Sequence, residues 1–362
     1  MFKHREAIDP LEIYVPGRPI EDVKREFGLD KVVKLASNEN PYGFSPKARE
    51  AVIGAFDGAA IYPDGNCTAL REALATKYGT SPNNFVFGAG ADEIIAMLGK
   101  VFINEGNECV TAEITFSQYA ASVLAMGGKM VYAPMKPDFS HDLDAIVERI
   151  TSKTRLVFIA NPNNPTGIIH TQEEQARFMK KVPRDCIVVF DQAYAEFADD
   201  PAYPNTFAMM KEYSNIIYMK TFSKAYGLAS FRVGYAIAVP EIIGMFEKIR
   251  APFNVSLQGQ TAAVAALNDS TFLNDSVEKN KRVKEFTIAK LTEMGVECLP
   301  TQANFVMANV KRNSRIMFTE LMKRGYIIRA GAAFGMDEYI RVTFGTMEEM
   351  EGFLTALESV LR

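Results

Sequence analysis

The feature that most constrains the fold of this chain is an alternation of short apolar runs with amphipathic helical stretches. Runs at 156–160, 187–190 and 216–219 read LVFIA, IVVF and IIYM, and helical patterns such as LDAIVERI (143–150) and TQEEQARFMKKV (171–182) separate most runs of this kind. A strand that is apolar along its whole length is buried on both faces, as in a mostly parallel sheet covered by helices. We therefore predict an α/β fold whose large domain, residues 46–255, holds such a sheet.

The pattern changes after APFNVS, at residues 251–256. Long helical stretches there lead to short strand-like runs, NFVMANV (304–310), GYIIRAG (325–331) and YIRVTFG (339–345), and then to a last helix. We therefore expect a smaller α+β domain at 256–362. The first 45 residues are irregular and contain several prolines, so we expect them to form an N-terminal arm and part of the small domain.

Composition excludes several classes of partner. The net charge is −4 and there is no basic tract, which gives no reason to expect nucleic acid or a membrane surface. The four cysteines lie far apart in the sequence and include no Cys-x-x-Cys pair, which fits free thiols in a reducing compartment better than disulfides or a zinc site. The three histidines are too scattered to indicate a metal site. No apolar run approaches membrane-spanning length, and the N-terminus lacks a signal-peptide core. We expect a cytoplasmic protein without a metal.

Polar clusters follow four of the apolar runs at the point where each predicted strand ends. LVFIA leads into NPNNPTG (161–167), IVVF into DQAY (191–194), IIYM into KTFSK (220–224), and FVFG into AGADE (89–93), which opens a helix. In open α/β sheets, ligands bind in the crevice beyond the carboxyl ends of the strands. The four clusters therefore predict one binding site.

Lys224 and Asp191 indicate which class of ligand would bind at these strand ends. Taken alone, Lys224 is most simply a solvated surface lysine, although a desolvated amine forms Schiff bases with carbonyls. Asp191 follows IVVF directly, and a buried carboxylate needs a cation beside it. A helix cap or an ion pair would explain Asp191 equally well. A pyridinium nitrogen is also such a cation, and a lysine Schiff base with an aspartate partner is how pyridoxal phosphate is held.

Neighbouring residues suit the rest of that cofactor. Thr221, Ser223 and Arg232 supply hydroxyls and a fork of donors for a phosphate, and the helix that begins near Ala91 adds backbone N–H groups. Other side chains suit the ring: Asn164 and Tyr194 can hydrogen-bond its phenolate oxygen, and Phe116 can stack on its face, unless Phe116 is an ordinary core residue.

The motifs NPNNPTG, DQAY, TFSKAYGLASFRVGY and RVTFGT, in this order and spacing, resemble those of the fold-type I pyridoxal-phosphate aminotransferases. KLASNENPYGFSP, YPDG, GAGADE and NFV are similar to motifs of the histidinol-phosphate aminotransferases within that family. The resemblance covers nearly the whole chain. It implies an aspartate-aminotransferase-like fold, pyridoxal 5'-phosphate as cofactor, and a homodimer with shared active sites.

The resemblance also implies roles for individual residues. Lys224 would carry the cofactor as a Schiff base and move protons, and Asp191 would meet the pyridine nitrogen. The groups around the cofactor would be Asn164 and Tyr194 at the phenolate oxygen, Phe116 on the ring, Thr221, Ser223, Arg232 and the backbone of Ala91 and Asp92 at the phosphate, and Tyr62 from the partner subunit. The substrate would meet Tyr14, Arg329 and Arg341.

This chain departs from the family pattern at a few positions, with Gln192 for glutamate, Ile114 for proline and Ser230–Phe231 in the loop before Arg232. None of these changes removes a catalytic group. The expected reaction moves the amino group between histidinol phosphate and 2-oxoglutarate in histidine biosynthesis. Three alternatives stay open: an aromatic amino acid aminotransferase, a pyridoxal-phosphate-dependent decarboxylase of a phosphorylated amino acid, and a non-catalytic regulator that binds the cofactor. The last would normally carry an attached DNA-binding module, for which these 362 residues leave no room.

Overall fold

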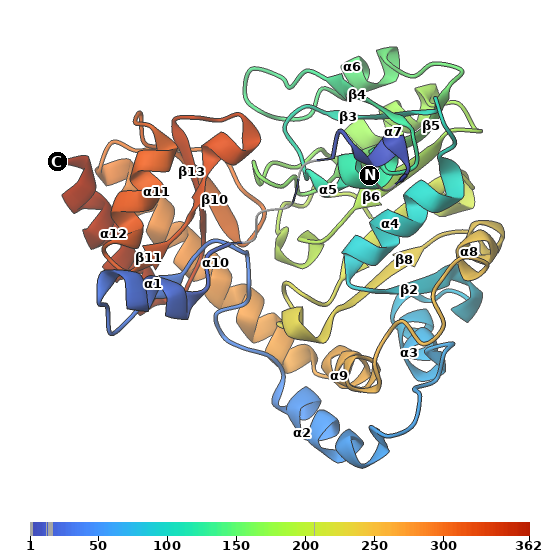
Figure 1. Ribbon diagram of the computed structural model, residues 1–362, viewed down its shortest axis with the longest axis horizontal. Helices are drawn as coiled ribbons and strands as arrows, with labels where there is room; N and C mark the ends of the chain where they lie inside the picture. The colour runs from blue at the N-terminus through green and yellow to red at the C-terminus, as the bar shows by residue number, and fades with distance from the viewer. Residues whose placement is uncertain (1–2, 12, 14–16, 206) are drawn as a thin grey trace.

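The computed structural model describes residues 3–11, 13, 17–205 and 207–362. Its larger body is built on a seven-stranded sheet with the order β2-β8-β7-β6-β5-β3-β4 (Figure 1). The strands of this sheet are β2 (Phe85–Ala89), β3 (Glu108–Ala112), β4 (Lys129–Ala133), β5 (Thr154–Ala160), β6 (Ile187–Asp191), β7 (Ile216–Thr221) and β8 (Val233–Ile237). The apolar runs of the sequence therefore form its centre.

The predicted mostly parallel sheet is confirmed. Pairings from β4 through β7 are all parallel, whereas β8 runs antiparallel to both β7 and β2. Two antiparallel pairings in succession restore the direction, so β2 points the same way as β5, β6 and β7. The carboxyl ends of these four strands consequently lie on one rim.

Helices cover both faces of the sheet, as the apolar strands predict. On β5, Val157 and Ile159 belong to one core and Leu156 and Phe158 to another. The first core is completed by residues of α2 (Pro46–Ala55), α3 (Thr68–Tyr78), α6 (Leu143–Glu148), α7 (Gln172–Lys181) and α9 (Leu257–Leu267). The second contains residues of α4 (Ala91–Phe102), α5 (Gln118–Leu124) and α8 (Pro240–Glu247). Period-two alternation along each strand thus builds two separate apolar layers.

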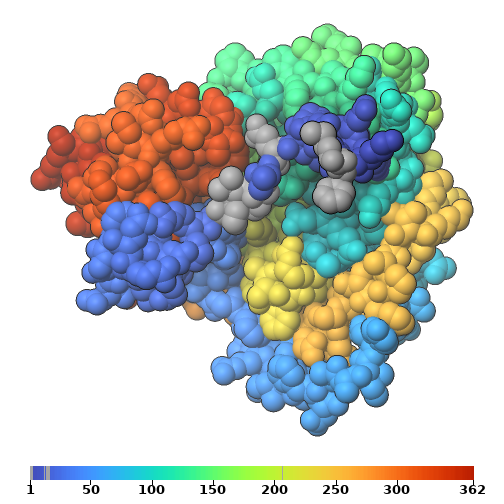
Figure 2. Space-filling model, in the orientation of Figure 1, coloured from blue at the N-terminus to red at the C-terminus, as the bar shows by residue number. Residues whose placement is uncertain are grey.

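The smaller body holds a four-stranded antiparallel sheet with the order β12-β13-β10-β9. Its strands are β9 (Glu297–Cys298), β10 (Phe305–Asn309), β12 (Arg329–Ala330) and β13 (Tyr339–Thr343). A third core joins this sheet to α10 (Ser270–Glu293), α11 (Ser314–Met322) and α12 (Met347–Leu361). In Figure 2 these C-terminal elements form an orange and red lobe beside the green and teal one.

The N-terminal segment is more regular than its prolines predict. It contains the helix α1 (Ile20–Phe27), which follows Pro19 and ends at Gly28 in the left-handed conformation. A short strand, β1 (Val33–Lys34), then pairs in parallel with β11 (Tyr326–Ile327) of the smaller body. The expectation of an irregular segment was therefore wrong for residues 20–27.

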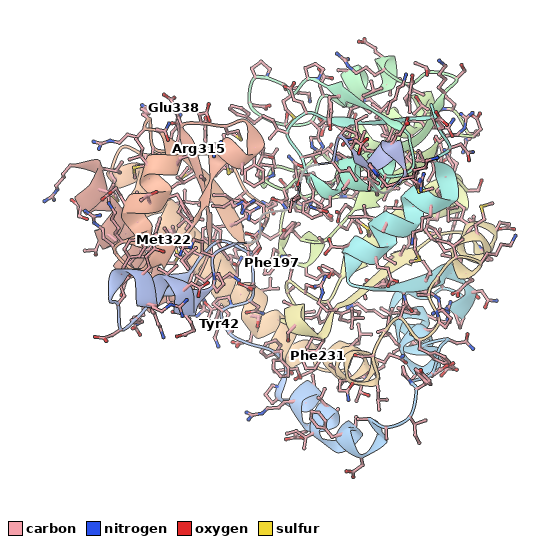
Figure 3. The ribbon with its side chains drawn as sticks, viewed as in Figure 1. Tyr42, Phe197, Phe231, Arg315, Met322 and Glu338 are labelled. Atoms are coloured by element: carbon pink, nitrogen blue, oxygen red, sulfur yellow. The ribbon has the colours of Figure 1, made fainter. Side chains whose placement is uncertain are left out.

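The two bodies meet through a small apolar cluster. It joins Tyr194 and Phe197, which follow β6, to Ala225 after β7 and to Ala303 and Phe305 of the smaller body. Figure 3 labels Phe197 close to this junction. The domain boundaries at residues 45 and 255 stay a prediction, and α9, which lies beyond the second, packs in a core of the larger sheet. Among the described helices, none is long and apolar enough to cross a bilayer.

Candidate active site

The four polar clusters that follow β2, β5, β6 and β7 lie at the shared rim of the large sheet, as predicted. β8 runs in the opposite direction, so its first residue, Val233, also lies at this rim. Arg232, which precedes Val233, is thereby brought to the same edge. The fold therefore places residues that are up to 140 positions apart beside one another, as the contact between Arg232 and Asp92 shows.

Lys224 lies three residues beyond the end of β7, in a turn that is only partly accessible. Its Nζ donates a 2.9 Å hydrogen bond to the carbonyl oxygen of Ser37 and lies 5.8 Å from the centre of the Tyr194 ring. Burial, reinforced by the charge of Arg341, lowers the pKa of Lys224 to about 8. The uncharged, nucleophilic form of this amine is therefore far more populated near neutral pH than it is in an ordinary lysine.

Asp191 ends β6 and is 7% exposed. Its Oδ2 accepts a 2.7 Å hydrogen bond from the Tyr119 hydroxyl, and its Oδ1 accepts one of 3.0 Å from the backbone N–H of Ala193. Burial raises the pKa of Asp191 to about 6, although both hydrogen bonds act in the opposite direction. Both donors are neutral, so a buried carboxylate in this place favours a cationic partner. The ring nitrogen of pyridoxal phosphate fits that requirement.

The residues predicted to bind a phosphate form a cradle between β7, β8 and α4. The side chains of Thr221 and Ser223 are buried, and the Thr221 hydroxyl accepts a 3.1 Å hydrogen bond from the Ser223 N–H. The Arg232 guanidinium lies 3.1 Å from Asp92 Oδ2 in the first turn of α4. Gly90, just before α4, leaves room for it, because a Cβ there would lie 2.4 Å from Arg232 Nη2. This arrangement suits a phosphate at a helix N-terminus.

Tyr194 is buried, and its hydroxyl accepts a 2.9 Å hydrogen bond from the side-chain amide of Asn38. Asn38 is held in turn by Thr343 of β13, which both donates to its side chain and accepts from its backbone N–H at 2.9 Å. Burial raises the pKa of Tyr194, so its hydroxyl keeps the proton that it can donate to a phenolate oxygen. Asn38 therefore connects the smaller sheet to a candidate cofactor ligand.

The two candidate substrate arginines lie opposite each other in the smaller sheet. Arg329 of β12 and Arg341 of β13 are partners in the antiparallel register. Arg341 is buried and donates to the side-chain oxygen of Asn164 and, at 2.7 Å, to the carbonyl oxygen of Ala36. Arg329 is half-buried, and none of the ion pairs found among the described residues includes it. Like charges directly opposite each other are unfavourable, and an anion between them relieves this cost.

The remaining predicted site residues are placed less directly. Phe116 is partly buried, with its ring edge-on to that of Tyr119 at 5.6 Å, and therefore lies on the Asp191 side of the site. Tyr62 is 78% exposed and stacks on Phe253 with the ring centres 4.7 Å apart, outside the cluster around Lys224. Tyr14 lies outside the described residues.

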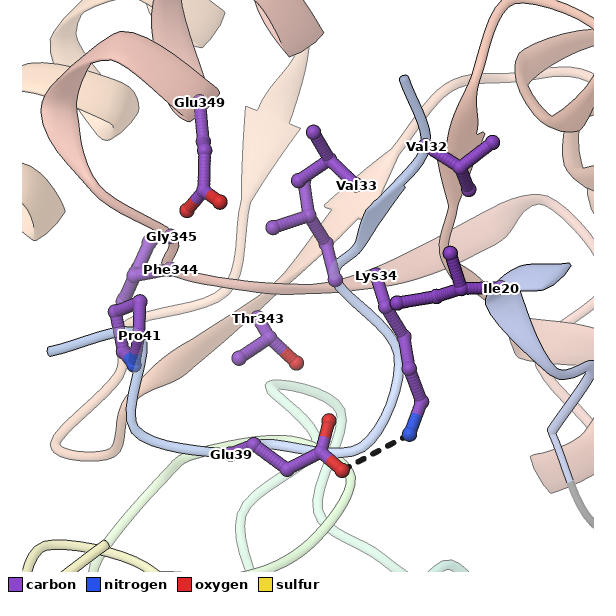
Figure 4. A pocket seen from close by; sticks show the side chains of 11 residues that line it. Ile20, Val32, Val33, Lys34, Glu39, Pro41, Thr343, Phe344, Gly345 and Glu349 are labelled. Atoms are coloured by element: carbon purple, nitrogen blue, oxygen red, sulfur yellow. Dashed lines mark hydrogen bonds and ion pairs between the residues drawn. The ribbon is translucent and has the colours of Figure 1, made fainter. Parts of the chain in front are cut away.

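A cavity of about 330 Å³ lies between the N-terminal segment that contains Ser37 and Asn38 and the smaller body (Figure 4). It is lined by residues 32–35, Glu39 and Pro41 together with the end of β13 and the start of α12, and an ion pair of 2.9 Å joins Lys34 to Glu39 at its edge. Thr343, which holds Asn38, borders it. None of the predicted catalytic residues lines this cavity, so it is not the candidate active site.

Three residues at the site were not assigned a role from the sequence. Ser37 and Asn38 lie in the quoted motif KLASNENPYGFSP, but nothing in the motif alone shows that they contact Lys224 and Tyr194. Tyr119 lies three residues after Phe116, the spacing of one helical turn, and this spacing is the signal that could have brought it into consideration.

Comparisons with known proteins agree with this geometry. The family model for aminotransferase class I and II matches residues 30–357. The histidinol-phosphate aminotransferase of Moorella thermoacetica is 46% identical over 360 residues, which are 99% of this chain and 93% of that protein. The crystal structure of histidinol-phosphate aminotransferase from Sinorhizobium meliloti in complex with pyridoxal-5'-phosphate matches with a TM-score of 0.91 and 29% identity, over 100% of this chain and 98% of that one. Aspartate aminotransferase from Thermus thermophilus has the same fold, with a TM-score of 0.86 and 19% identity over 100% of both chains.

Proposed function

Because this chain belongs to the class I and II aminotransferases, we propose that it transfers the amino group between histidinol phosphate and 2-oxoglutarate, with pyridoxal 5'-phosphate as cofactor. The reaction is a step of histidine biosynthesis. The observation that carries the choice of substrate is the pairing of Arg329 with Arg341 across β12 and β13. The names of the relatives support the same substrate.

The two arginines suit two different anionic substrates. Histidinol phosphate has a phosphate and no α-carboxylate, whereas 2-oxoglutarate has two carboxylates. One cation would not serve both, but a buried Arg341 and a half-buried Arg329 on one face offer two forks of donors. Arginine binds phosphate and carboxylate through two parallel hydrogen bonds, which lysine cannot do. Arg341 would bind the carboxylate and Arg329 the far anionic group.

The cofactor would be held by the residues at the rim of the large sheet. Thr221, Ser223, Arg232 and the first backbone N–H groups of α4 would bind its phosphate, and Asp191 its ring nitrogen. Asn164 accepts from Arg341 through its oxygen, so its amide nitrogen is the atom that would donate to the phenolate oxygen, beside the Tyr194 hydroxyl. When bound, pyridoxal phosphate supplies an aromatic ring that accepts the electron pair left on the substrate α-carbon after proton removal.

The protein's own groups then manage the protons. The Lys224 amine, with a pKa of about 8, would hold the cofactor covalently between turnovers. When it is free, the Lys224 amine would take the proton from the substrate α-carbon as general base. It would then deliver this proton, as general acid, to the cofactor carbon C4′. Asp191 would hold a proton at the ring nitrogen. Buried Tyr194 and Asn164 would fix the ring so that the α-carbon faces Lys224.

A panel of half-reactions tests this proposal. Purified holoenzyme is mixed with histidinol phosphate, phenylalanine or tyrosine, and the change in the cofactor absorption spectrum is followed. Histidinol phosphate should react most efficiently, and Arg329→Ala should raise its KM about tenfold to a hundredfold, the loss expected for a charge-assisted contact. The phenylalanine half-reaction of the same variant serves as control and should change less. Faster reaction of wild type with aromatic amino acids would replace the proposed substrate, and release of carbon dioxide would indicate a decarboxylase.

We also propose that the enzyme is a homodimer with shared active sites. Four large apolar side chains are exposed on α2 and on the segment that follows it, namely Ile53, Phe56, Ile61 and Tyr62. A fifth, Phe253, is also exposed and stacks on Tyr62. Exposed apolar side chains that gather in one part of the chain are typical of a protein interface, and a second copy would cover them. Tyr62 would then reach the partner subunit's cofactor phosphate.

Mixing two inactive variants tests the shared site. Lys224→Ala removes the nucleophile and Tyr62→Ala the phosphate contact, so a hybrid dimer contains one site with both residues intact. Activity should appear on mixing if the sites are shared. If the sites lie within single subunits, the hybrid has no site with both residues, and mixing should restore nothing.

A cytoplasmic location is proposed together with this function. The four cysteines, Cys67, Cys109, Cys186 and Cys298, are free, which fits a compartment that keeps thiols reduced. Cell fractionation followed by immunoblotting would test this location, and recovery with membranes or outside the cell would refute it.

A further inference from the structure

Tyr119 is the residue whose contact the proposed function leaves unexplained. Its hydroxyl donates a 2.7 Å hydrogen bond to Asp191 Oδ2. Among the described residues it is the side chain that donates to this carboxylate, and the other donor is the backbone N–H of Ala193. The carboxylate proposed to meet the cofactor is therefore already engaged from the protein side.

The ring of Tyr119 is fixed, so this hydrogen bond has a defined direction. Tyr119 is fully buried and lies on α5. Its ring stacks on that of Phe158 in β5, with centres 4.3 Å apart and planes 3° from parallel, and Phe116 packs edge-on to it at 5.6 Å. Two aromatic contacts of this geometry hold the hydroxyl on Asp191 without help from the cofactor.

The proton of this hydrogen bond stays on the tyrosine. Burial and the neighbouring Asp191 raise the pKa of Tyr119 well above its ordinary value. Burial also raises the pKa of Asp191, whereas the Tyr119 and Ala193 hydrogen bonds lower it. The other charged groups near Asp191 are Asp92, which raises its pKa, and Lys224, which lowers it. Tyr119 therefore favours the ionised carboxylate against the effect of burial.

We propose that Tyr119 is a positioning residue that keeps the proton shared by Asp191 and the cofactor's ring nitrogen on the nitrogen. This inference rests on the proposed function. A carboxylate that accepts a hydrogen bond from Tyr119 is a weaker base, so Asp191 competes less for the shared proton. Without the hydroxyl, the same proton lies closer to Asp191 and the ring nitrogen carries less positive charge. Electron withdrawal from the substrate α-carbon then weakens, while the groups that bind the substrate are unchanged.

Tyr119→Phe tests this role because it removes the hydroxyl and keeps both ring contacts. Tyr78→Phe is the matched control, since the Tyr78 hydroxyl also makes a 2.7 Å hydrogen bond inside the protein, to Tyr235, away from Asp191. Wild type and both variants are loaded with ¹⁵N-labelled pyridoxal phosphate. The ¹⁵N chemical shift of the ring nitrogen is recorded near neutral pH, together with kcat and KM for histidinol phosphate. Asp191→Asn provides the reference for a ring nitrogen that has lost its proton.

In Tyr119→Phe the ¹⁵N shift should move toward that of Asp191→Asn, and kcat should fall about tenfold to a hundredfold with little change in KM. Tyr78→Phe should keep the wild-type shift. An unchanged shift in Tyr119→Phe overturns the inference, even if kcat falls, because the residue would then be merely structural. If wild type binds the labelled cofactor but does not turn over histidinol phosphate, the proposed substrate fails, and the ¹⁵N comparison still decides the role of Tyr119.

Discussion

Replacing Gly90 by alanine should weaken binding of the cofactor phosphate more than it weakens the fold. Gly90 has φ 79° and ψ 170°, a conformation found almost only in glycine, which costs another residue about 1–3 kcal/mol. The added Cβ would also lie 2.4 Å from Arg232 Nη2 and 2.9 Å from its Cζ. Ordinary contacts begin at 3.4 Å, so the guanidinium must retreat by about 1 Å. A shift of this size would displace the Arg232 donors from the position proposed for the cofactor phosphate.

The expected loss follows from the contact that Arg232 would make. A hydrogen bond to a charged group contributes about 1.5–3 kcal/mol, which corresponds to about tenfold to a hundredfold in affinity. Apoenzyme is titrated with pyridoxal phosphate and, separately, with pyridoxal, which lacks the phosphate. Gly90→Ala should lose affinity for pyridoxal phosphate by this factor and keep its affinity for pyridoxal.

Gly79→Ala is the matched control. Gly79 also has a positive φ, of 61°, but among the described residues only its neighbours along the chain come within 4 Å of the position of its Cβ. It should lower the melting temperature, as Gly90→Ala does, and leave both titrations unchanged. If Gly90→Ala binds pyridoxal phosphate as tightly as wild type, or loses pyridoxal equally, the position assigned to the phosphate is wrong.

Three further predictions concern Lys224 and two buried groups outside the site. Borohydride reduction of the holoenzyme should label Lys224, and a label on another lysine would refute the assignment. The rate at which apoenzyme captures the cofactor should rise with pH up to about 8, the pKa of this amine, and then level. Lys220 and Glu196 form a buried ion pair of 3.1 Å. Glu196→Ala should lower the free energy of unfolding, measured in urea, by about 3–5 kcal/mol, whereas the double variant Lys220→Met with Glu196→Leu should lower it far less. Equal losses in the two proteins would contradict this reasoning. Burial lowers the pKa of His141 to about 3 and of His170 to about 4. Below about pH 6.5 the unfolded chain therefore binds protons that the folded protein does not bind. As the pH falls through this range, the free energy of unfolding should fall by up to ~1.4 kcal/mol per pH unit for each histidine. His170→Gln should flatten this dependence, and an unchanged slope would refute it.

The rim of the large sheet was predictable because local sequence carries its signals. The central strands β5, β6 and β7 each contain an unbroken apolar run, and the return of polar residues, as at Asp191, lies at or next to the carboxyl end of the strand. Strand direction then places Asp191, Thr221 and the start of α4 together without further information. The pairing of Arg329 with Arg341 also follows from two recognisable strands, although their register became known only from the structure.

The contacts that adjust the site were not predictable, because each joins segments that are remote in sequence. Tyr119 is 72 residues from Asp191, and Asn38 is 156 residues from Tyr194. Nothing local distinguishes Tyr119 from a core tyrosine. The helix α1 was missed for a different reason: it has only eight residues, and Val23 is its one buried residue, so its apolar pattern is short. Two-residue strands such as β1 and β12 are too short to show any periodicity.

Residues 36–38 connect the charges of the site to the smaller body. Consecutive carbonyl oxygens of Ala36 and Ser37 accept hydrogen bonds from Arg341 and Lys224, and the next side chain, Asn38, donates to Tyr194. A peptide carbonyl carries only a partial charge, so it holds a cation in place with less energy than a carboxylate does. In the proposed function, an anionic substrate would therefore compete well with the Ala36 carbonyl for Arg341. The Ser37 carbonyl likewise keeps the Lys224 amine in position without fixing a positive charge on it, in agreement with its lowered pKa. Since Thr343 of β13 holds Asn38, movement of the smaller body on substrate binding would act on Tyr194 and Lys224 together.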